Sequence, residues 1–230
     1  MNLNLQNMKT GHDKGFTLLE LLIVVSIIAI LSVALVLVLN PAEALRKARD
    51  SQRMSDLSTM KTALGLYLTG TSTPYLGSVT ANSACKTLPL TAWGSPFKIG
   101  YSLDSDIGAI TDTTLDGSSV AVYQQSTSPS LTDGTGWIPV NFDTLTGGSP
   151  ISNLPLDPTN TIADLASVAS TDLVYRYACS QTPLSFEMDA QLESTAYTST
   201  DDKRTTDGGN NANLYEVGTN LKILGTGTTF

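Results

Sequence analysis

The chain has 230 residues, of which 41% are hydrophobic and 15% charged, and its formal net charge is −8. From residue 62 onward it carries 6 basic and 16 acidic side chains, so this part repels phosphate backbones and is not expected to bind nucleic acid. His12 is the only histidine and there are two cysteines, which excludes a zinc cluster and leaves little for acid–base or nucleophilic catalysis. We therefore do not expect an enzyme.

The first predicted element is an apolar run from Phe16 to Leu39 with a single charged residue, Glu20. As a helix this run is about 36 Å long, enough to cross a hydrocarbon core of about 30 Å. It is longer than the apolar region of a secretory signal peptide, so we expect it to be retained as a membrane helix. A carboxylate in hydrocarbon is costly unless it is paired, so Glu20 is expected to be functional.

The residues that open this run are Lys14-Gly15-Phe16-Thr17-Leu18-Leu19-Glu20. They resemble the class III signal of type IV prepilins and type II secretion pseudopilins, in which a prepilin peptidase cuts after the glycine and methylates the new terminus. The resemblance implies cleavage between Gly15 and Phe16 and methylation of Phe16. It also implies that Glu20 pairs with the Phe16 amine of a neighbouring subunit. The cleaved leader is residues 1–15, and a start at Met8 would give it a more usual length.

The same resemblance implies a structural subunit that leaves the membrane lipid and joins identical or related pilin subunits in a helical filament. An inner-membrane assembly platform would drive this step, and the head would be extracytoplasmic, in the periplasm or outside the cell. Such filaments serve adhesion, motility, secretion or DNA uptake, and a pseudopilin of a type II secretion system is an alternative within the class. From another class, the alternative is an uncleaved single-pass membrane protein that displays a binding domain. The charges that flank the apolar run favour the opposite orientation, with the C-terminal side in the cytoplasm.

The helix is expected to continue past Pro41, where the proline removes a backbone donor. Residues 16–40 then form its transmembrane half and residues 41–70 its amphipathic half. Within 41–70, apolar residues at 3- and 4-residue spacing predict a stripe packed on the chain's own head: Leu57, Met60, Leu64, Tyr67 and Leu68. Residues 42–56 have few apolar positions, so we expect their mixed charges to face neighbouring helices, or lipid phosphates before assembly.

The remaining residues, 71–230, are predicted to form a β-rich head. The clearest strand is 186–193, whose strict alternation predicts one buried face and one face in water. Other predicted strands are 173–179, 214–217, 221–224, and the more weakly patterned 97–103 and 120–124. The expected fold is α+β and pilin-like, with one long N-terminal helix packed on a small antiparallel sheet. The segment 154–158, Leu-Pro-Leu-Asp-Pro, resembles the proline-rich segment that precedes the sheet in major pseudopilins.

Two further sites are expected in the head. Cys85 and Cys179 are expected to form a disulfide because paired cysteines are usual in an exported domain, although two buried thiols are the alternative. A loop rich in oxygen ligands is a candidate calcium site, as its resemblance to the C-terminal calcium site of major pseudopilins implies. The same loop also fits an ordinary solvated loop. Its candidate ligands are Asp201, Asp202, Asp207 and Asn210. No other cofactor is expected.

Overall fold

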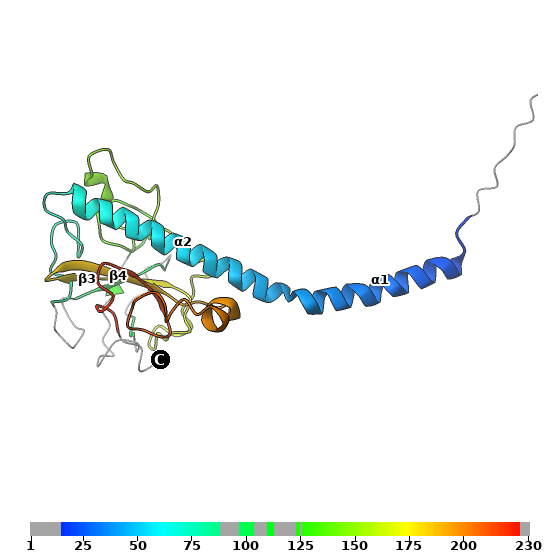
Figure 1. Ribbon diagram of the computed structural model, residues 1–230. Coiled ribbons are helices and arrows are strands. Elements are labelled where there is room, and N and C mark those ends of the chain that lie inside the picture. The colour runs from blue at the N-terminus through cyan, green and yellow to red at the C-terminus, as the bar shows by residue number, and fades with distance from the viewer. Residues whose placement is uncertain (1–14, 88–96, 104–109, 113–122, 125, 226–230) are drawn as a thin grey trace, which may run out of the picture. The chain divides into compact units, whose positions relative to one another are not determined.

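The computed structural model describes residues 15–87, 97–103, 110–112, 123–124 and 126–225 (Figure 1). The predicted leader up to residue 14, including the alternative start Met8, lies outside the described residues, as do residues 120–122 of one predicted strand. The chain divides into two compact units, Met1–Ala44 and Leu45–Phe230.

Helix α1, Leu18–Leu39, fills most of the first unit. It begins at Thr17, whose hydroxyl caps the first turn, and it ends at Asn40, whose backbone is left-handed with φ of 39°. Asparagine tolerates this conformation better than most residues. The next residue, Pro41, begins helix α2, Pro41–Gly70, where its missing N–H costs nothing because first-turn N–H groups have no helical partner. The single helix predicted from the sequence is therefore interrupted at Asn40.

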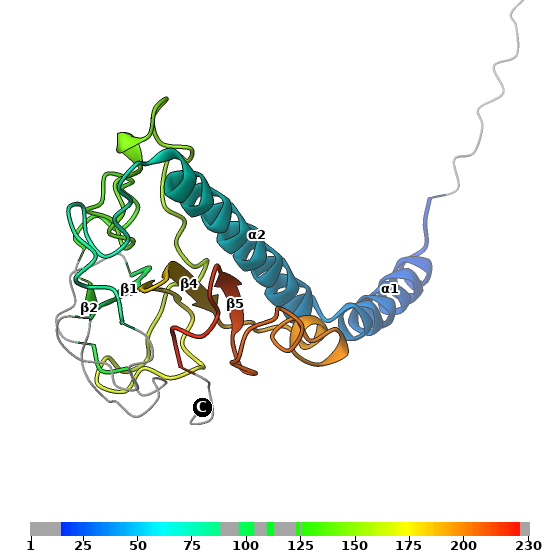
Figure 2. The same cartoon turned by 60° about the vertical axis from the view of Figure 1, so that its left-hand side comes forward.

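Helix α2 lies against the sheet of the second unit (Figures 1 and 2). The predicted apolar stripe is confirmed, since Leu57, Met60, Leu64 and Tyr67 are buried and Leu68 packs against the same cluster. Their partners on the sheet and its loops include Trp137, Tyr175, Tyr177, Phe186 and Met188. A leucine, methionine or phenylalanine side chain contributes about 1.5–3 kcal/mol when fully buried, so this interface holds the second unit together.

The sheet has five strands in the order β2-β1-β3-β4-β5. Strand β3, Tyr175–Gln181, pairs antiparallel with β4, Leu184–Ala190, through the tight connection at Thr182–Pro183. Antiparallel pairing continues to β5 on one side and to β1 on the other, while β1 and β2 are parallel. The outer strands are short: β1, Ile99–Tyr101; β2, Tyr123–Gln124; and β5, Tyr215–Gly218. The predicted α+β, pilin-like arrangement of a long N-terminal helix and a small, mainly antiparallel sheet is confirmed.

One detail of the strand prediction is wrong, because both faces of β4 are buried. Glu187 and Asp189, expected to face water, are 0% and 1% exposed. A separate apolar cluster covers this second face, and it includes Ile99 of β1 together with Val168 and Ile223 of the loops. Alternation in a sequence identifies two different faces, but it cannot tell a solvated face from one that a distant loop covers.

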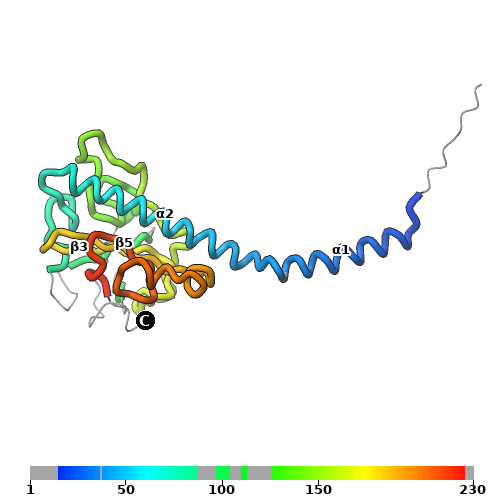
Figure 3. The backbone as a smooth tube through the Cα atoms, viewed as in Figure 1, coloured from blue at the N-terminus to red at the C-terminus, as the bar shows by residue number. Residues whose placement is uncertain are grey.

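The strand predicted at 221–224 is also absent: these residues form turns. The backbone N–H groups of Ile223 and Leu224 donate to the carboxylate of Glu187 rather than to a neighbouring strand. A side-chain acceptor therefore takes the place of a strand ladder here, and the C-terminal segment lies beside the sheet (Figure 3).

Candidate functional site

The N-terminus of α1 holds the residues that the sequence singles out. The Thr17 hydroxyl accepts a hydrogen bond from the Glu20 backbone N–H at 3.2 Å. In return, Glu20 Oε2 accepts bonds from the Thr17 N–H and hydroxyl, both at 2.8 Å. This reciprocal capping box satisfies two donors of the first turn. It also holds the Glu20 carboxylate at Thr17, the residue that directly follows Phe16.

Gly15 and Phe16 precede the helix in a segment without regular secondary structure, and Phe16 is 87% exposed. A peptidase needs an accessible, non-helical peptide, because the backbone of a helix is already hydrogen-bonded internally. The structure thus places the predicted scissile bond outside regular structure, immediately before the capped helix.

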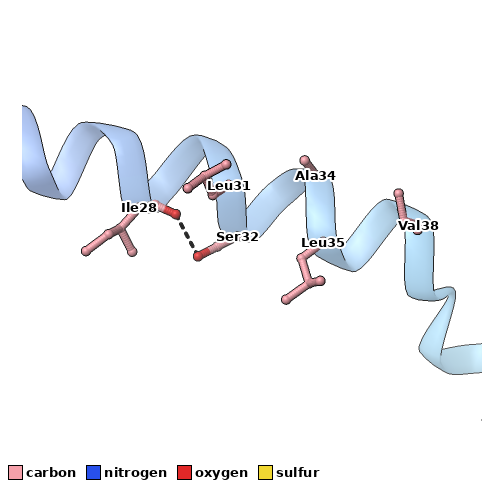
Figure 4. Close-up of a pocket in the computed structure, with 6 residues that line it drawn as sticks. All are labelled: Ile28, Leu31, Ser32, Ala34, Leu35 and Val38. Carbon is pink, nitrogen blue, oxygen red and sulfur yellow. Dashed lines mark hydrogen bonds between the residues drawn. The ribbon is translucent and has the colours of Figure 1, made fainter.

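Apolar side chains point outward all round α1, and none of those described is buried. The hydroxyl groups of its two serines are hydrogen-bonded to the helix backbone. Ser26 donates to the Leu22 carbonyl at 2.7 Å and Ser32 to the Ile28 carbonyl at 2.8 Å. Figure 4 shows the second bond among the apolar side chains along the helix. By length and composition this is the part of the described chain able to span a membrane. An uncovered apolar surface of this extent indicates anchoring in lipid or contact with other apolar helices.

A buried ionic cluster joins the first half of α2 to the head. Arg53 is fully buried and its guanidinium forms a bidentate pair with Asp157, at 2.6 and 2.9 Å. The same group donates to Asp50 at 2.9 Å and to Glu193 at 2.6 Å. Glu193 also receives a bidentate pair from Arg49, with both distances at 2.8 Å. Hydrogen bonding to Arg49, with further help from Arg53, lowers the pKa of Glu193 to about 2.

This cluster corrects the expectation that all charges of residues 42–56 face neighbouring helices. Asp50 is buried and accepts the backbone N–H groups of Glu193 and Ser194, at 2.7–3.1 Å, so it also fastens the chain that follows β4. The sequence does not predict these contacts, because the head partners of Asp50 and Arg53 lie more than 100 residues away along the chain. Arg49, Asp50 and Arg53 are therefore held to the head by charged hydrogen bonds rather than by apolar contact.

Cys85 and Cys179, the two cysteines expected to pair, are joined by a disulfide. The bond ties the segment after α2 to strand β3, and the backbone follows it: the Lys86 N–H donates to the Cys179 carbonyl at 2.8 Å. Cys85 lies in the apolar cluster under α2, so the disulfide closes the core that the helix covers.

The candidate calcium ligands have other partners in the structure. Asp201 pairs with Lys203 at 2.6 Å and Asp202 with Arg204 at 2.8 Å. Asp207 accepts the backbone N–H groups of Gly209 and Glu216, and the Asn210 amide, in its hydrogen-bonded orientation, donates to the Leu221 carbonyl and to Glu216 Oε1. Among the described residues no three acidic, histidine or cysteine side chains gather in a metal-binding arrangement. A calcium ion needs six to eight oxygen ligands, so this loop does not fit one as it stands.

Residues 11–36 match the family model described as the prokaryotic N-terminal methylation motif. Neither the curated proteins nor the solved structures gave a match to the chain. The matched residues cover the scissile pair, the capping box and most of α1. The N-terminal segment of this chain is therefore the class III signal of type IV pilins and pseudopilins, and it supports a pilin-like or pseudopilin-like precursor.

Proposed function

We propose that the chain is a structural prepilin subunit. A prepilin peptidase removes residues 1–15, and methylated Phe16 becomes the N-terminus of a subunit that assembles through α1 into a type IV pilus-like filament. The observation that carries this proposal is the combination of an accessible Gly15–Phe16 peptide with a capped helix that is apolar on every side. The head then forms the filament coat, outside the cytoplasm.

Glu20 has two successive roles in this scheme. In the precursor it caps its own helix through Thr17. After cleavage, the positively charged amine at Phe16 is the stronger partner, because a charge-assisted hydrogen bond is roughly twice as strong as a neutral one. In a stack of apolar helices, that pair would set the axial register between a subunit and its neighbour. The carboxylate would then be neutralised in the filament core, where an unpaired charge is costly.

The subunit itself performs no catalysis in this proposal, and its partners supply the chemistry. These partners are the peptidase, the inner-membrane assembly platform and related subunits, with lipid around α1 before extraction. A pseudopilin of a type II secretion system would use the same N-terminal helix, so filament location separates the two roles. A surface pilus would be recovered by shearing intact cells, whereas a pseudopilus would remain with the cell envelope.

The test compares four forms of the full chain in cells that have a prepilin peptidase and an assembly platform. Gly15→Val should block cleavage and leave the chain in the membrane. Glu20→Gln should be cleaved but enter filaments at least about tenfold less, since it loses one charge–charge contact. Glu43→Gln, which changes a partly exposed acidic residue in the next helix, is the matched control and should assemble like the wild type. Filaments formed equally well by the Gly15 variant would contradict the proposal.

A further inference from the structure

The face of the sheet that turns away from α2 carries more buried acid than base. Glu187 and Asp189 of β4 and Glu216 of β5 are all buried there. Arg176 of β3 is already shared by two carboxylates, since it pairs with Asp189 at 2.6 Å and with Asp112 at 2.9 Å. Among the described residues, no lysine or arginine forms an ion pair with Glu187 or Glu216. These two carboxyl groups must therefore be stabilised by something other than a basic side chain.

Only one of the two carboxylate oxygens of Glu187 accepts hydrogen bonds. Its Oε2 accepts the backbone N–H groups of Ile223 at 2.6 Å and Leu224 at 2.8 Å. Its Oε1 is buried and has no hydrogen-bond donor. A carboxylate oxygen buried without a donor is unfavourable by several kcal/mol, so a group is missing at this atom.

Glu216 approaches Glu187 from the neighbouring strand. Glu187 lies opposite Gly218, which has no side chain, and Glu216 lies two positions away, opposite Asp189. Such diagonal neighbours are within reach of long side chains, and the two carboxyl groups interact directly with each other. Glu216 Oε2 has a donor of its own, the Asn211 backbone N–H at 2.7 Å. The atom that lacks a donor therefore belongs to Glu187 and has a carboxylate beside it.

We propose that Glu187 and Glu216 share one proton at neutral pH, held between Glu187 Oε1 and the Glu216 carboxyl group, and that this proton holds the C-terminal segment 221–225 against β4 as a pH-sensitive latch. The shared proton joins Glu187 Oε1 to the Glu216 carboxyl group, while Glu187 Oε2 still accepts from Ile223 and Leu224. One proton therefore supplies the hydrogen bond that Oε1 lacks. Without it, two negative charges would be in contact at a site that excludes water. This inference does not depend on filament assembly.

The groups around Glu187 and Glu216 favour the protonated form of the pair. Burial raises the pKa of Glu187, and burial together with Glu187 raises the pKa of Glu216 to about 10. Asp189 adds negative charge from the same strand, while Arg176 is held by its own carboxylates. From the neighbouring loop, Asp207 accepts the Glu216 backbone N–H, and Tyr101 donates to Asp112 farther along the face. Lys222, an exposed residue, is the charged group on the latch itself.

The sign of the pH dependence follows from these shifts. In the closed latch the pair binds a proton that an opened, hydrated Glu187 would release near its ordinary pKa of 4.5. The latch is therefore fully stable below that pH, and it weakens as the pH rises towards the raised pKa values. Because one proton is released on opening, the equilibrium constant for opening the latch should rise about tenfold per pH unit across this window. Opening would expose Ile223 and Leu224, which are buried in the apolar cluster on this face.

The test is hydrogen exchange on the full chain in detergent micelles at several pH values between 6 and 9. In the wild type, the protection factors of the Ile223 and Leu224 amides should fall about tenfold per pH unit. In Glu187→Gln, whose amide donates to Glu216 permanently, they should not depend on pH. The reference is the Thr161 amide, which donates to the Leu173 carbonyl in a different part of the head. The matched control variant is Asp143→Asn, which removes an exposed carboxylate.

A second measurement does not depend on any variant folding well. The infrared spectrum of the wild type at neutral pH should contain the C=O stretch of a protonated carboxylic acid, and Glu187→Gln should lack it. The proposal fails if that band is absent, or if the protection factors of wild type and Glu187→Gln share one pH dependence. It also fails if added calcium, rather than added acid, restores protection, because a cation would then occupy the place of the proton.

Discussion

Arg53 gives the sharpest test of how α2 is attached to the head. We expect Arg53→Met to destabilise the second unit strongly, although methionine fits a helix well and keeps most of the side-chain volume. The reason lies in what is left behind: Asp50 and Asp157 are almost completely buried, and each would lose its positive partner. Each carboxylate still accepts hydrogen bonds from two backbone N–H groups, so it loses only part of its stabilisation.

The expected size of the effect follows from burial. Removing one partner of a buried ion pair costs about 3–5 kcal/mol, mainly because an uncompensated charge remains. Arg49 provides the comparison, since it also pairs with Glu193 but its side chain is 34% exposed. A partly exposed pair contributes less than a buried one, so Arg49→Met should cost about 1 kcal/mol, well below the loss for Arg53→Met. In the double variant Arg53→Met/Asp157→Asn, the unpaired negative charge of Asp157 is removed. Part of the lost free energy of unfolding should therefore be recovered.

The assay is urea unfolding of the full chain in detergent, followed by the fluorescence of tryptophan, because Trp137 is buried in the core that α2 covers. The free energies of unfolding of wild type, Arg53→Met, Arg49→Met and the double variant are compared under one set of conditions. Equal, small losses for both arginine variants would refute the reasoning, because they would show that burial does not govern the strength of this cluster.

The remaining predictions concern pH and the disulfide. The pKa of Glu193 is lowered to about 2 by Arg49 and Arg53. Its stabilising contribution is therefore complete above the ordinary value of 4.5 and is lost as the pH falls towards 2; Glu193→Gln should remove this part of an acid titration of unfolding free energy. Replacing Cys85 and Cys179 by serine opens a loop with a sequence separation of 94 and should cost about 4–5 kcal/mol in urea unfolding. A loss below about 1 kcal/mol would contradict the loop-closure argument.

Local patterns predict the parts of this fold that depend on neighbours in the chain. The apolar run, the acid that follows the glycine–phenylalanine pair and the stripe from Leu57 to Leu68 are all visible in the sequence. Periodicity also places the strand around Phe186. Each of these features depends on residues within a few turns or one strand, so the sequence carries the information directly.

What the sequence does not reveal depends on distant partners. Arg53 reads as one basic residue among several on α2, and only the fold brings Asp157 and Glu193 to it. Glu187 alternates with apolar residues like a water-facing residue, yet loops cover it and the C-terminal segment uses it as an acceptor. The predicted calcium loop has the composition of a cation site, but its own Lys203 and Arg204 pair with the acids. Charge composition alone does not distinguish an internal ion pair from a ligand site.

The most direct test of the central claim is mass spectrometry of the N-terminal peptide of the full chain, extracted from the membranes of cells with an active prepilin peptidase. We predict a peptide that begins at Phe16 and carries one added methyl group, because the Gly15–Phe16 bond is exposed and precedes the capped helix. A peptide that still begins at Met1 or Met8 would contradict the account. The chain would then be an uncleaved membrane protein that displays its head on a single helix.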